Sequence, residues 1–89
     1  MEISHVDVTF DFDDQYLQEK EIFLDYLSRE KWIQNSEKIW RVELDQSLSV
    51  KDQLSVIKKY IENASKISKI KAVDYAIISD EAVYFNKID

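Results

Sequence analysis

The side chains best suited to chemistry stand near the start of the chain, where HVDVTFDFDD (residues 5–14) alternates apolar and polar residues and ends in carboxylates. Hard divalent cations prefer oxygen ligands, so the carboxylates of this stretch, Asp11 among them, could bind such an ion. One aspartate without a second ligand at a fixed spacing specifies no metal, and the alternative is an ordinary solvated aspartate. Asp13 and Asp14 add carboxylates nearby, but helix N-termini collect Asp for capping and dipole reasons alone.

His5 is the only histidine and could act as a general acid or base. It precedes Asp11 by six residues, which is about 20 Å along an extended strand. The two side chains therefore cannot form a direct pair within one chain. No nucleophilic site of the Ser-His-Asp or Cys-His kind is indicated, since there is one histidine and no cysteine. We expect His5 to be a surface residue.

The composition bounds the class of protein. The 89 residues suffice for one domain, residues 1–89, at the small end of what a single core supports. The absence of cysteine excludes disulfides and thiolate metal sites. No segment approaches the roughly 20 apolar residues of a membrane span, and the N-terminus does not resemble a signal peptide. We therefore expect a cytoplasmic protein that does not contact membranes.

The chain contains neither glycine nor proline. Glycine-rich phosphate-binding loops are therefore excluded, because their backbone adopts conformations that only glycine reaches at low cost. The formal net charge of −6 opposes non-specific attraction to nucleic-acid phosphates. A local lysine cluster could still contact phosphate, but we interpret the cluster here as a solvated helix face. It comprises Lys58, Lys59, Lys66, Lys69 and Lys71.

Hydrophobic periodicity places these residues on strands and helices. A strand is predicted over residues 3–12 and helices over 14–30 and from Val50 onward. The first helix is expected to bury Leu17, Phe23, Leu24 and Leu27. The second is expected to bury Val50, Leu54, Ile57, Ile61 and Ala64. Asp13 or Asp14 is the predicted N-cap of the first helix, and Ser49 with Asp52 forms a capping-box-like start for the second.

β-branched and aromatic runs predict further strands over 38–44, 72–78 and 82–88, with a short strand or turn at Trp32 and Ile33. The order predicts an α+β fold, a ferredoxin-like β-α-β-β-α-β sandwich with both helices on one face of an antiparallel sheet and a short extra C-terminal strand. The uncovered face is expected to carry His5, Asp7, Thr9 and Asp11. Trp40, Tyr75, Tyr84 and Phe85 could stack bases if they faced outward, but we favour core or dimer-interface positions.

Three short motifs carry a family resemblance: FDF (10–12) before the first helix, SEKIWRVEL (36–44), and SLSVKDQLSVIKKYI (47–61). With them, the chain resembles the smaller subunit of the CRISPR adaptation machinery and its relative, virulence-associated protein D, over nearly its whole length. The resemblance implies a homodimer of ferredoxin-like domains whose open sheet faces meet. It also implies a metal-dependent nuclease in which Asp11 is the catalytic and metal-binding residue, with Mg²⁺ or Mn²⁺. The chain departs from the family in lacking its turn glycines and in being more acidic.

Two functions from different classes stay open. The first is a homodimeric endonuclease, or a catalytically inactive relative associated with nucleic acid. The second is an acidic protein-interaction module, such as a phage-encoded inhibitor that presents carboxylates to a basic nucleic-acid-binding protein. In either case an exposed apolar strand over residues 82–88 predicts a homodimer, with Asp7 and Asp11 along a polar seam.

Overall fold

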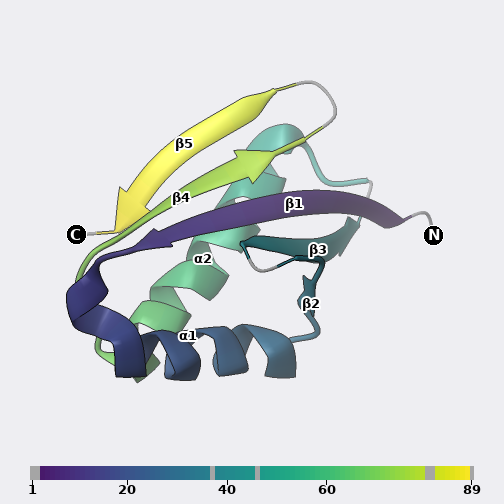
Figure 1. The fold of residues 1–89 in the computed structure, drawn as a ribbon. Coiled ribbons are helices and arrows are strands. Elements are labelled where there is room, and N and C mark those ends of the chain that lie inside the picture. Colours follow the sequence, from purple (N-terminus) through teal and green to yellow (C-terminus); the bar gives the residue numbers. More distant parts are fainter. Residues whose placement is uncertain (1–2, 37, 46, 80–81, 89) are drawn as a thin grey trace.

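Two helices cover one face of a five-stranded antiparallel sheet (Figure 1). The computed structural model describes residues 3–36, 38–45, 47–79 and 82–88. The elements in chain order are β1 (Ile3–Phe12), a 3-10 turn (Asp14–Tyr16), α1 (Leu17–Arg29), β2 (Ile33–Gln34), β3 (Ile39–Asp45), α2 (Val50–Ser68), β4 (Val73–Ile78) and β5 (Val83–Ile88). The predicted α+β class and the placement of both helices on one face are confirmed.

The strands lie in the order β2-β3-β1-β4-β5, and each neighbouring pair is antiparallel. This order is compatible with a ferredoxin-like sandwich to which β5 is added beside β4. The central strand β1 pairs with β3 only as far as Thr9, opposite Ile39. Its pairing with β4 continues to Phe12, opposite Val73. Among the described residues, the last three of β1 therefore have a sheet neighbour on one side only.

Alternation along the strands separates a covered face from an open face, which is the sheet surface away from α1 and α2. On the covered face of β1, Val6 and Val8 are buried and Phe10 and Phe12 are half-buried. The covered residues of β3 and β4 are also buried: Trp40, Val42, Leu44, Val73, Tyr75 and Ile77. The open face of β1 carries, as predicted, His5, Asp7, Thr9 and Asp11.

The helices bury narrower stripes than the sequence predicts. Fully buried are Phe23, Leu27, Ile57, Ile61 and Ala64, and half-buried are Leu24 and Leu54. Leu17 is 70% exposed and Val50 is 51% exposed, so the prediction that they belong to the buried stripes is wrong. Each is the first residue of its helix. A helical side chain covers the turn that precedes its own Cα, and at a first position there is no such turn to pack onto the sheet.

The Ser49 cap of α2 is confirmed, whereas the predicted Asp13 cap falls on the 3-10 turn before α1, and α1 itself has no side-chain cap at its N-cap residue Tyr16. The carboxylate of Asp13 accepts a hydrogen bond from the backbone N–H of Gln15 at 3.1 Å and so caps the 3-10 turn that precedes α1. The hydroxyl of Ser49 accepts from the backbone N–H of Asp52 at 3.2 Å at the start of α2. No helix within the described ranges is long and apolar enough to cross a membrane.

Turns form here without glycine. The Asp45 carboxylate accepts a hydrogen bond from the backbone N–H of Ser47 at 2.9 Å, and this contact lowers the pKa of Asp45. Lys31 and Lys69 adopt the left-handed backbone conformation that favours glycine, with φ of 70° and 66°. Residues 80–81, part of the predicted break between the last two strands, lie outside the described residues.

Candidate functional site

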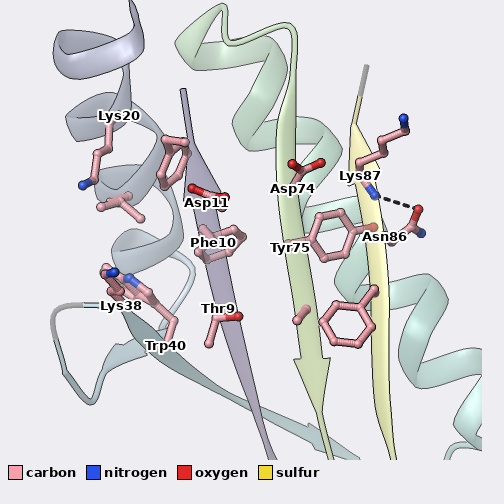
Figure 2. A pocket seen from close by; sticks show the side chains of 14 residues that line it. Thr9, Phe10, Asp11, Lys20, Lys38, Trp40, Asp74, Tyr75, Asn86 and Lys87 are labelled. Atoms are coloured by element: carbon pink, nitrogen blue, oxygen red, sulfur yellow. Dashed lines mark hydrogen bonds between the residues drawn. The ribbon is translucent and has the colours of Figure 1, made fainter. Parts of the chain in front are cut away.

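The candidate site lies where β1 ends, at a cavity of about 1020 Å³ that runs across β1, β4 and β5 (Figure 2). Residues of α1 and the start of β3 also line the cavity. The cavity extends to α1 and β3 because β3 pairs with β1 no further than Thr9, which leaves the last residues of β1 without a described neighbouring strand on that side. Asp11, the predicted catalytic and metal-binding residue, lines this cavity and is exposed to solvent.

A second carboxylate stands opposite Asp11. Asp74 is its register partner on β4, and both side chains are exposed on the open face. Figure 2 shows the two on neighbouring strands. Directly opposed side chains in an antiparallel pair have Cβ atoms about 4.5–5.5 Å apart, and like charges placed so repel each other. No described residue forms an ion pair with either carboxylate.

The pair fits a hydrated divalent cation better than a cage made wholly by protein. Within the described ranges, no group of three or more His, Cys, Asp or Glu side chains is arranged to hold a metal. Mg²⁺ usually keeps several waters and binds through one or two carboxylates together with substrate phosphates. Asp11 and Asp74 match that donor set.

Lysines from three parts of the fold line the same cavity: Lys20 on α1, Lys38 just before β3 and Lys87 on β5. The ammonium of Lys20 lies 5.7 Å from the centre of the Phe12 ring, a cation–π contact at the end of β1. Lys87 is the register partner of Asp74. The cavity therefore combines two carboxylates with cations that could contact an anionic ligand.

An apolar patch adjoins the two carboxylates on the open face. It consists of Ala76 and Ile78 on β4 and their register partners Phe85 and Val83 on β5, and we call it the β4–β5 patch. Phe85 is 83% exposed and Val83 is 50% exposed. The other aromatic residues considered from the sequence are buried or half-buried in the core: Trp40, Tyr75 and Tyr84.

Two other polar residues of the β1 row, Asp7 and His5, are paired with β3. Asp7 Oδ1 accepts a hydrogen bond from Arg41 Nε at 3.1 Å. His5 Nε2 lies 3.2 Å from Glu43 Oε1. His5 is an exposed residue, as predicted, and its partner is on β3 rather than at the cavity. The structure thus brings Asp11 together with a carboxylate of β4 and leaves His5 and Asp7 in separate pairs.

Tyr75 lines the cavity from β4, but its hydroxyl is buried and has no hydrogen-bond partner among the described residues. Burial raises the pKa of Tyr75 above its ordinary value of 10.0, and the Glu62 carboxylate raises it further, while the nearby Asn86 side chain lowers it in part. The phenol therefore stays neutral near pH 7.

Sequence reasoning missed Asp74. A weak signal was present, since Asp74 is the only charged residue in AVDYAII (72–78) and a charged side chain in such a strand must face solvent or a partner. What places it opposite Asp11 is the register of two strands more than sixty residues apart. Register depends on the burial pattern of the whole sheet, so the pairing could not be read from either strand alone.

This site is defined by the structure of this chain alone. The family resemblance, the metal-binding role of Asp11 and its catalytic role all remain predictions. Comparison of the chain with known protein families, with curated proteins and with solved structures finds no match.

Proposed function

We propose that the chain works as a homodimeric domain of the ferredoxin-like kind, in which two copies meet through their open faces and through β5. The observation that carries this proposal is Phe85, which is 83% exposed in the β4–β5 patch. Contiguous exposed apolar surface is typical of protein interaction sites, and Phe is enriched at such interfaces.

The edge position of β5 supports the same function. β5 pairs with β4 on one side, and no described strand flanks its other side. An exposed apolar edge strand presents unpaired backbone N–H and C=O groups that readily pair with another chain. Contact with a second copy would satisfy these groups and cover Val83 and Phe85.

The charges on the open face also favour a protein contact. Asp7 is paired with Arg41 and Glu43 with His5, so two of the acidic residues on this face already have partners. The acidic-inhibitor alternative calls for a row of outward carboxylates without partners. On β1 and β4 only Asp11 and Asp74 meet that description among the described residues, which gives that alternative less support.

Sedimentation velocity over a micromolar concentration series tests the dimer. We expect the parent chain to sediment as a dimer and Phe85→Asp to sediment as a monomer with an unchanged circular dichroism spectrum. Leu17→Asp is the matched control, because Leu17 is also a large exposed apolar residue but lies at the start of α1. A monomeric parent, or a Phe85→Asp chain that dimerises as well as the control, overturns the proposal.

The opposed carboxylates favour a second function, metal-dependent cleavage of nucleic acid. Asp11 and Asp74 would hold Mg²⁺ or Mn²⁺, and the ion would lower the pKa of a bound water when present. The side chains of Lys20 and Lys38 would contact the phosphate of the substrate, since both line the same cavity. Asp11 would then be the residue on which both binding and cleavage depend.

Calorimetric titration with Mn²⁺ and a cleavage assay on labelled RNA and DNA test this function separately. Both Asp11→Asn and Asp74→Asn are expected to lose Mn²⁺ binding, whereas Glu21→Gln, an exposed control on α1 with the same change in charge, keeps it. Cleavage that persists in chelator or in Asp11→Asn removes Asp11 from the mechanism. Mn²⁺ binding without cleavage leaves a cation site that is not an active site.

A further inference from the structure

Charge is unevenly distributed along this acidic chain. Residues 50–71 contain six lysines and two acidic residues, for a net charge of +4, which leaves −10 for the rest of the chain. These residues form α2 and the loop that follows it. The helix layer therefore presents a basic region on a protein whose remaining surface is strongly acidic.

Four of these lysines form a stripe along α2. Lys51, Lys58, Lys59 and Lys66 are all exposed, and their spacing of seven or eight residues brings them back to one side of the helix every two turns. At 3.6 residues per turn they fall within an arc of about 100°, along about 22 Å of the axis. We call these four residues the α2 lysine stripe. It lies opposite the helix face that packs Ile57 and Ile61 into the core.

The stripe is not neutralised within the fold. None of its lysines forms an ion pair with a described residue. Glu62 lies on the same side of the helix, four residues from both Lys58 and Lys66, but it is half-buried and forms no ion pair with either lysine. The four ammonium groups are thus available to an external anion.

The make-up of the stripe indicates which kind of anion. Protein interfaces are depleted in lysine and enriched in aromatic residues, and no aromatic residue stands on this side of α2, where Ser55 is the exposed neighbour. Membrane-surface helices bury an apolar face in the lipid, but the apolar face of α2 is already packed on the sheet. A rigid line of lysines instead matches a line of phosphates. Two helical turns, about 11 Å, equal the rise of about three phosphates of one DNA strand along the duplex axis, at 3.4 Å each.

We propose that the α2 lysine stripe is a docking surface for the phosphate backbone of a duplex nucleic acid. Recognition there is electrostatic and independent of base sequence, because lysine contacts to phosphate fix position without reading bases. The acidic remainder of the chain, with a net charge of −10, limits how strongly a second duplex could bind elsewhere. This inference rests on neither the proposed dimer nor Asp11.

Fluorescence anisotropy with a short labelled duplex DNA tests the proposal. We expect the parent to bind at about 50 mM salt and to lose affinity steeply by about 200 mM, as phosphate contacts require. Lys59→Gln combined with Lys66→Gln is expected to weaken binding at least tenfold and to reduce the slope of log K against log salt by about 2. Both lysines are exposed, and a thermal unfolding curve verifies that the double variant is folded.

Lys31→Glu is the matched control, because it changes the net charge by the same two units from an exposed position outside α2. It is expected to bind within a few-fold of the parent. Equal weakening in the control and the double variant would mean that net charge alone governs binding, and this result overturns the proposal. Absence of duplex binding at low salt overturns it too. So does binding to phosphatidylserine vesicles without binding to DNA.

Discussion

The two faces of the sheet are built from the same strands but differ in burial and in charge. On the covered face of β1, Val8 is fully buried among the side chains of α1 and α2. On the open face, Asp74 of β4 stands opposite the like-charged Asp11 of β1. Two residues further along β4, the same face carries the apolar Ala76. The covered side is almost wholly apolar, and the buried Tyr75 hydroxyl, without a hydrogen-bond partner among the described residues, is an exception. The open side instead places two carboxylates, without ion pairs to described residues, beside an exposed phenylalanine.

The features that packing does not explain lie on the open face. The covered face buries apolar side chains in the alternating pattern of its strands, and the unpartnered hydroxyl of Tyr75 is an exception to it. Such agreement between local pattern and packing is typical of a surface selected for folding. The open face breaks two preferences, because it opposes two like charges and exposes the ring of Phe85 to water. Such features cost stability, so a partner or ligand that removes the cost is the natural explanation.

The largest expected effect is on the covered face. Leu27→Ala removes a fully buried side chain from α1 and is expected to lower the free energy of unfolding by about 2–5 kcal/mol. Leu17→Ala makes the same change in the same helix at a residue that is 70% exposed, and it is expected to cost less than about 0.5 kcal/mol. Urea denaturation of both variants measures the contrast. Similar losses at the two positions would contradict the division into covered and exposed residues.

The covered face was largely predictable from the sequence. Alternation along residues 5–12 separates the two faces of β1 without any tertiary information, and the i, i+4, i+7 spacing of Ile57, Ile61 and Ala64 locates the buried side of α2. The errors, Leu17 and Val50, fall at helix starts. Periodicity assigns a residue to a side of the helix, but it does not say whether the sheet extends beneath that turn.

The open face was predictable only within single strands. The row containing Asp11 follows from the alternation of β1, but its neighbours Asp74 and Phe85 belong to strands whose order and register are set by the whole core. The cavity at the end of β1 also depends on residues far apart in the sequence, because it forms where β3 begins opposite Thr9. The candidate site is therefore a product of assembly rather than of any motif.

A smaller effect is expected from the polar groups that the covered side does contain. The hydroxyl of Ser65 donates a hydrogen bond to the backbone carbonyl of Ile70 just past the end of α2, in a buried setting. Ser65→Ala leaves that carbonyl without this donor and is expected to cost about 1 kcal/mol. Ser55→Ala, an exposed position of the same helix, serves as the control in the same urea titrations and should be neutral or slightly stabilising.

The buried phenol of Tyr75 should make the covered side sensitive to alkali. Its pKa is raised from 10.0 in the folded chain, so above that pH the unfolded chain releases a proton that the folded chain retains. Stability from this group is therefore complete below pH 10.0 and falls as the pH rises through the folded pKa. Tyr75→Phe removes the group, and the parent should lose stability relative to this variant only in alkaline solution. A constant difference at all pH values would argue against a shifted pKa.

The smallest effect is expected on the open face, and it has the opposite sign. Asp74→Asn removes one of two directly opposed carboxylates, so in metal-free, low-salt buffer the variant should be more stable than the parent by about 0.2–1 kcal/mol. In a chain of net charge −6, losing any carboxylate relieves some general repulsion. Glu21→Gln, at an exposed position of α1, therefore measures that background and should gain less.

The dependence on salt and on Mn²⁺ shows whether the gain in stability of Asp74→Asn comes from relieved repulsion at a cation site. Added salt screens exposed charges, so the difference between variant and parent should shrink as ionic strength rises. If the pair binds a divalent cation, Mn²⁺ stabilises the parent in proportion to the site's occupancy and leaves Asp74→Asn unchanged, so the order of stabilities reverses. A variant no more stable than the Glu21→Gln control in metal-free buffer would show that the two carboxylates do not repel each other. The open face would then carry no electrostatic cost at this point, and the contrast with the covered face would rest on Phe85 alone.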